Sequence, residues 1–147
     1  MNAKMKPAST IFLLLCVELA TTSCGSRHTA TSPVAAAIKY HNRAAEILNR
    51  HHEAIGIVDD GEMQSILRYY ELALASAKQA HIDDMDRAYP GFGTHFRDEF
   101  EHGLELYVDN YNAADEAGRQ KFMQAQVLID QWGDWYSDNY DRIQAAR

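Results

Sequence analysis

The sequence predicts an all-α protein whose four helices form an antiparallel up-down-up-down four-helix bundle. From residue 32 onward, apolar residues recur at intervals of three and four, which is the spacing of one face of a helix. The sequence shows no strand-like alternation, and short polar or glycine-containing connections separate the segments. Because each helix has one apolar face and the connections are short, antiparallel packing of neighbours is the simplest way to bury these faces.

The first two predicted helices are separated by an acidic turn. Ser32 is a suitable N-cap for the first helix, and Pro33 occupies the first helical position, where proline is favoured. We expect this helix to run to about residue 57. Asp59 and Glu62 then have the spacing of a capping box, which predicts the start of a second helix that runs to about Tyr89.

A proline–glycine turn ends the second predicted helix. Pro90 disfavours helix in the residue before it, and Gly91 frees the backbone to turn. Thr94 is the expected N-cap of the third helix, which ends near Gly118, and the fourth helix follows to the C-terminus. Projection at about 100° per residue gives each helix an apolar face. The residues expected in the core are Val34, Ile38, Ala45, Leu48, Ile55, Met63, Ile66, Leu67, Tyr70, Leu74, Ala77, Met85, Phe96, Phe100, Leu104, Tyr107, Tyr111, Phe122, Ala125, Ile129, Trp132, Tyr136, Tyr140 and Ile143.

The first 23 residues have the features of an export signal. Lys4 and Lys6 precede an apolar run at residues 11–17, and small residues follow it. The apolar run is shorter than the roughly 20 residues that a membrane span needs. The stretch at 19–26 resembles the lipobox of bacterial lipoproteins, in which a small residue precedes an acylated cysteine, here Cys24.

This resemblance implies a lipid anchor and a place in the bacterial cell envelope. Cys24 is the only cysteine left once Cys16 is removed with the signal, so a disulfide within the chain is excluded. Gly25 after the lipidated cysteine implies the outer membrane, with the domain facing the periplasm. We expect residues 24–32 to form a flexible tether and residues 33–147 to form the folded domain. Lipoboxes usually carry leucine three residues before the cysteine, where this chain has threonine, so plain secretion after signal cleavage is the alternative.

The chain is acidic, with a formal net charge of −7 at pH 7. Removal of residues 1–23 takes away two lysines and one glutamate and leaves a net charge of −8. An acidic surface is repelled by the phosphates of nucleic acid, so nucleic acid is not an expected ligand. A basic protein surface is the partner that this charge favours.

Four polar residues interrupt the predicted apolar faces. His41 and His52 lie near the middle of the face of the first helix. His81 lies at the centre of the face of the second helix, and Asp84 lies toward its edge. A buried polar group costs about 1–3 kcal/mol unless it finds a partner. The simplest interpretation is structural: each imidazole forms one hydrogen bond across the bundle, to a tyrosine or an asparagine, and otherwise packs as a flat ring.

A metal site is the alternative interpretation of these residues. In an antiparallel hairpin with its turn near residue 91, His81 is level with His102. Asp84 is then level with Glu99, which has the Glu-x-x-His spacing of metal-binding bundles with His102. Two imidazoles and two carboxylates suit zinc, copper or iron. However, helical projection turns His102 toward water, and a di-iron bundle needs two such motifs.

Aromatic and acidic residues are interleaved in the fourth helix. Trp132 and Tyr136 lie on its apolar face, and Trp135 lies at the edge of that face beside Asp134 and Asp138. Because tryptophan dominates the hot spots of protein interfaces, Trp135, Asp134 and Asp138 are candidate protein-binding residues. The alternative is that the aromatic rings fill the core while the aspartates form a solvated face.

These observations predict a non-enzymatic envelope lipoprotein whose helical bundle binds another protein. It would act as an inhibitor of the immunity type or as an accessory subunit of an envelope machine. The sequence contains no recognisable nucleophile motif, glycine-rich phosphate loop or haem attachment motif, and no cofactor is expected. The alternative function is a periplasmic metal- or ligand-binding bundle that uses the buried histidines.

Overall fold

The part of the chain that the structure describes is built from helices. The computed structural model describes residues 32–54 and 58–146, with the side chains at 52–54 outside that description. No strand occurs within these residues, so the predicted all-α class is confirmed. In chain order the elements are α1 (Pro33–Ala54), α2 (Asp60–Lys78), α3 (Asp83–Ala88), α4 (Phe92–Thr94), the π-helical η1 (His95–Glu101), α5 (His102–Asn110) and α6 (Glu116–Ala145).

The predicted export signal, the lipidation site Cys24 and all of the tether before Ser32 lie outside the described residues. None of the described helices combines the length and the apolar composition that a membrane crossing needs. The residues that can be discussed structurally are therefore those of the helical domain.

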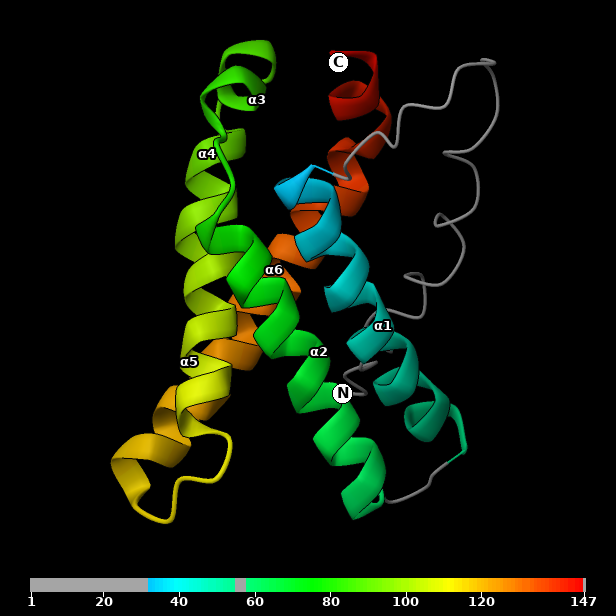
Figure 1. Ribbon diagram of the computed structural model, residues 1–147, viewed down its shortest axis with the longest axis vertical. Helices are drawn as coiled ribbons and strands as arrows, with labels where there is room; N and C mark the ends of the chain where they lie inside the picture. Colours follow the sequence, from blue (N-terminus) through cyan, green and yellow to red (C-terminus); the bar gives the residue numbers. More distant parts are fainter. Residues whose placement is uncertain (1–31, 55–57, 147) are drawn as a thin grey trace, which may run out of the picture.

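Two antiparallel pairs of helices make up the described domain. α1 and α2 lie side by side and run in opposite directions, and the column formed by α4, η1 and α5 runs opposite to α6 (Figure 1). α2 also contacts η1 and α5, which joins the two pairs. Buried side chains from both pairs form one hydrophobic core.

Aromatic side chains fill the core between η1, α5 and α6. Phe96, Phe100 and Trp132 are at most 1% exposed, and Trp132 stacks on Phe100 with 5.0 Å between ring centroids. Burial of one such side chain stabilises the fold by roughly 1.5–3 kcal/mol. The apolar faces predicted for the third and fourth helices are confirmed at Phe96, Phe100, Leu104, Tyr107, Ala125, Ile129, Trp132, Tyr136 and Ile143, which are all buried.

Small residues line the contact between α1 and α2. Ala37 and Ala44 of α1 and Ala73 and Ala77 of α2 are fully buried. Alanine has a short side chain, so the two backbones approach each other closely at these positions. Ala45 was predicted to lie in the core but is only partly buried, whereas its neighbour Ala44 is fully buried. The buried face of α1 is thus rotated slightly from the predicted face.

The predicted N-caps of the first two helices are confirmed. Ser32 Oγ accepts a hydrogen bond from the backbone N–H of Ala35 at 3.2 Å, and Asp59 Oδ1 accepts one from the N–H of Glu62 at 2.8 Å. The first turn of a helix leaves these amides without intrahelical partners, so a polar side chain just before it stabilises the start.

The prediction that the second helix continues to Tyr89 is wrong, because α2 ends at Lys78. The guanidinium of Arg97, from η1, donates to the carbonyl of Ala77 at 3.1 Å and to that of Ala80 at 2.7 Å. A cation at the C-terminus of a helix satisfies its last carbonyls and interacts favourably with the helix dipole. This tertiary contact caps the end of α2, where neither proline nor glycine is present.

The next helical segment begins earlier than expected. Gly91 adopts a φ of +94°, which confirms the predicted turn, and α4 starts directly after it at Phe92. Thr94 forms no capping hydrogen bond, so its predicted role is wrong. Asp86 of α3 supplies the partner instead, because its Oδ1 accepts a hydrogen bond from the N–H of Gly93 at 2.8 Å.

The boundary predicted near Gly118 is also wrong. α5 ends at Asn110, and Asp115 caps α6 by accepting a hydrogen bond from the N–H of Gly118 at 2.7 Å. Gly118 therefore lies in the first turn of α6 rather than at a helix end. A Cβ atom there would lie 2.3 Å from the Cβ of Ala113, so close packing, and not a turn, requires the glycine.

Candidate functional site

Among the described side chains, His41 is the one predicted core histidine that lies in the core, with 5% of its surface exposed. Its ring stacks on Tyr70 and meets Phe100 edge-on, with 5.9 Å and 5.4 Å between centroids. Nδ1 lies 3.2 Å from Asn42 Oδ1, which is a hydrogen bond in the tautomer with the proton at Nδ1. Burial lowers the pKa of His41 to about 4, so the ring is neutral at neutral pH.

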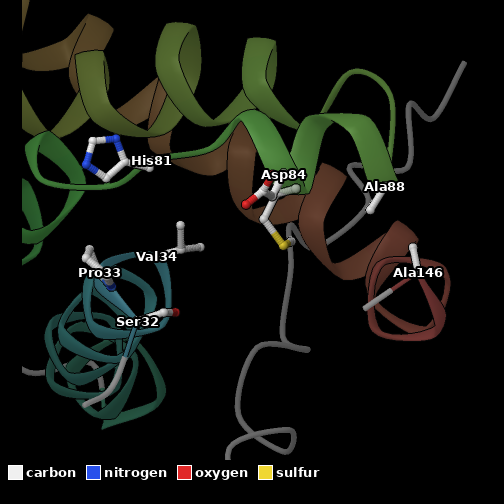
Figure 2. Close-up of a pocket in the computed structure, with 8 residues that line it drawn as sticks. Ser32, Pro33, Val34, His81, Asp84, Ala88 and Ala146 are labelled. Carbon is white, nitrogen blue, oxygen red and sulfur yellow. The ribbon is translucent and has the colours of Figure 1, made fainter. Parts of the chain in front are cut away.

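His81 and Asp84 do not belong to the core. Because α2 ends early, His81 lies exposed in the connection to α3, and Asp84 is exposed in the first turn of α3. They line different parts of a shallow cavity of about 360 Å³ (Figure 2). The Asp84 carboxylate pairs with Arg87 of its own helix instead of facing an imidazole. The other residues that line the cavity are Ser32, Pro33, Val34, Met85, Ala88 and Ala146.

The predicted metal set is not brought together in the described part of the chain. Glu99 Oε1 lies 2.9 Å from His95 Nδ1, whereas the half-exposed His102 lies 4.0 Å from Glu105 Oε2. Residues 32–51 and 58–146 contain no group of three histidine, cysteine, aspartate or glutamate side chains that could hold a metal ion. The side chain of His52 lies outside the description.

The sequence analysis did not identify the polar pair formed by His95 and Glu99, which lies beside Trp135. The ring of His95 stacks on Trp135 with 4.1 Å between centroids, and the two planes differ by 17°. The Glu99 Oε2 atom is buried and has no hydrogen-bond partner among the described residues. The i,i+4 spacing of histidine and glutamate was the available signal, since such residues face each other on a helix. The pair lies on η1, and π-helical turns are frequent at functional sites.

Trp135 is packed on the inner side of α6 rather than on its acidic side. It is partly buried, and its ring also contacts Tyr89 and Phe92 at 6.0 Å and 6.2 Å between centroids. Asp134 and Asp138 are exposed. Helical projection places both aspartates about 60–100° from Trp135. Asp134 and Asp138 therefore share one side of α6, and Trp135, the third residue predicted for this binding surface, points away from that side.

The exposed side of α6 carries two large apolar residues that sequence reasoning missed. Met123 and Val127 are 64% and 54% exposed, and they are the exposed large apolar side chains of the described residues. They lie one turn apart on the same side of the helix as Asp134 and Asp138, and we call these four residues the α6 outer face. The available signal was two apolar residues at i,i+4 spacing outside the predicted apolar face.

In the described domain, the candidate functional residues therefore lie mainly at or near the surface and do not form a polar site in the core. Comparison of the chain with protein-family models, with curated proteins and with solved structures gives no match. A functional conclusion therefore depends on the chemistry of these residues.

Proposed function

We propose that this chain is a non-enzymatic bacterial lipoprotein that binds a basic protein through the α6 outer face. A lipid on Cys24 would hold it in the outer membrane, with the domain in the periplasm. Its two helix pairs would form one antiparallel up-down-up-down four-helix bundle. The partner would be a protein that it inhibits, as an immunity protein does, or an envelope machine that it joins as an accessory subunit.

The observation that carries the proposal is the exposure of Met123 and Val127 next to each other. Single exposed apolar residues are common, but two large ones on adjacent turns form a small apolar patch. Protein interfaces have apolar centres with polar rims, and methionine is enriched in them. Burial of these two side chains by a partner would contribute favourable free energy in proportion to the apolar area removed from water.

Charge favours a basic partner. Asp134 and Asp138 follow Val127 along the same side of α6, and the whole chain carries a net charge of −7. Opposite charges at the rim of an interface accelerate association and exclude acidic competitors. An apolar centre followed by an acidic rim would therefore select a basic protein surface.

A site-specific cross-linking experiment tests the interaction. The photoreactive residue benzoylphenylalanine is placed at Val127 in cells, and at the exposed Arg68 of α2 as a matched control. We expect one basic protein to cross-link at Val127 and not at Arg68, and the yield to fall when Asp134→Asn and Asp138→Asn are added. Equal cross-linking at both positions, or a yield that ignores the two aspartates, would contradict the proposal.

The anchor is tested separately. We expect the chain to incorporate labelled palmitate and to fractionate with the outer membrane. Cys24→Ser should abolish labelling and release the protein into the soluble periplasmic fraction. Release of the unchanged chain without lipid would show plain secretion instead. The cross-linking experiment would still test the interaction surface.

A further inference from the structure

A second cavity, of about 270 Å³, opens between four helices on the side of α6 next to the outer face. Its volume is close to the lower end of the range for small-molecule sites, about 300–1,000 Å³. The cavity is lined by Leu48 of α1, Tyr70 of α2, Tyr107 of α5, and Gln126, Ile129 and Asp130 of α6. Side chains from both helix pairs therefore line this cavity.

Two tyrosines form the inner part of this cavity. Tyr70 and Tyr107 are each 3% exposed, and their rings meet edge to face with 4.5 Å between centroids. Burial raises the pKa of Tyr107 to about 12 and raises the pKa of Tyr70 further, so both hydroxyls are neutral. Both tyrosines line the cavity, and tyrosine rings attract cations.

Asp130 is the one charged group that lines the cavity, where Gln126 precedes it by one turn. Local desolvation raises the pKa of the Asp130 carboxyl, and repulsion from Asp134 raises it further. Asp130 lines the same cavity as Tyr70 and Tyr107, and its negative charge contributes to the raised pKa of Tyr70. The Asp130 side chain is exposed, so a cation that enters the cavity can pair with its negative charge.

We propose that this cavity binds the ammonium end of an alkylamine. Asp130 would pair with the ammonium group, Gln126 would accept a hydrogen bond through its amide oxygen, and Leu48 and Ile129 would pack against the alkyl chain. The tyrosine rings would add cation–π attraction. A metal ion fits less well, because one carboxylate among aromatic and aliphatic walls provides too few oxygen ligands.

The same chemistry is present in a free alkylamine and in the lysine side chain of a protein. The test therefore uses n-butylammonium ion and a blocked peptide with a single lysine, with n-butanol as the neutral control. The protein is the purified full chain with Cys24→Ser, and binding is followed by amide chemical shifts at Gln126 and Ile129.

We expect n-butylammonium or the lysine peptide to cause saturable shifts, and n-butanol to cause none. Asp130→Asn should weaken binding by about tenfold or more, because it removes a charged hydrogen-bond partner. Leu48→Phe should also weaken binding by narrowing the cavity while the charge remains. The exposed Asp98→Asn, on η1, removes the same charge elsewhere and should leave the affinity unchanged.

Tighter binding of the peptide would identify a lysine side chain as the natural occupant, and tighter binding of n-butylammonium would identify a free amine. Shifts that do not saturate, equal binding of n-butanol, or an Asp130→Asn variant with unchanged affinity would each overturn the proposal. This test is read from Asp130 and Leu48, whereas the proposed interface is tested by cross-linking at Val127, so failure of one proposal can be distinguished from failure of the other.

Discussion

Acidification should destabilise this protein through one buried imidazole. In the folded protein His41 has a pKa of about 4, compared with the usual 6.5 of an exposed histidine. Between these values the unfolded chain binds a proton that the folded chain does not bind, so the free energy of unfolding falls as pH decreases from 6.5 to 4. A pKa difference of this size corresponds to about 3 kcal/mol. Above pH 6.5 the ring is neutral in both states, so protonation of His41 does not reduce the free energy of unfolding there.

The assay compares the protein with His41→Leu, which has a similar volume and does not titrate. Urea unfolding is followed by circular dichroism at several pH values, and the stability difference between the two proteins is plotted against pH. We expect the unchanged protein to lose about 3 kcal/mol relative to His41→Leu between pH 6.5 and 4. His81→Leu, at an exposed histidine, is the matched control: it keeps His41 and should lose stability between pH 6.5 and 4 as the unchanged protein does. A difference that is constant with pH would refute the assignment of His41 as a neutral core residue.

Three further substitutions test the packing. Gly118→Ala should cost about 1–3 kcal/mol because its Cβ meets Ala113, and Ala113→Gly should restore thermal stability in the double variant. Arg97→Met should cost about 1–3 kcal/mol in urea unfolding by removing two carbonyl caps, whereas Arg68→Met at the surface should change stability by less than about 0.5 kcal/mol. Trp132→Ala should cost about 3–5 kcal/mol; a smaller loss in calorimetry would show that the aromatic core repacks.

Much of the fold could be predicted where the pattern is local. The spacing of Phe96, Phe100 and Leu104 was enough to identify a buried helical face, because a side chain's direction on a helix follows from its position. Asp59 as an N-cap was also predictable, since the capping bond spans only three residues. The burial of His41 followed from the same periodicity.

The candidate site was predicted less well, because its residues depend on contacts between elements. His81 and Asp84 were expected inside a continuous second helix, but α2 ends at Lys78, where Arg97, about twenty residues later, caps the carbonyls, and both residues lie exposed beyond this end. No sequence feature near the end of α2 predicts this contact. Trp135 was placed correctly at the edge of its face, but only its stacking on His95 shows which way the ring turns.

From the sequence alone, helical periodicity therefore predicted the all-α class and the apolar faces. The chemistry of short turns predicted where the first helices begin. Tertiary contacts decided where α2 stops, why Gly118 lies inside a helix and which polar residues reach the interior. The physical reason is the range of the interactions. A helix face and a cap depend on residues three or four apart, whereas a carbonyl capped by a distant arginine, or a cavity shared by four helices, exists only after the elements have packed.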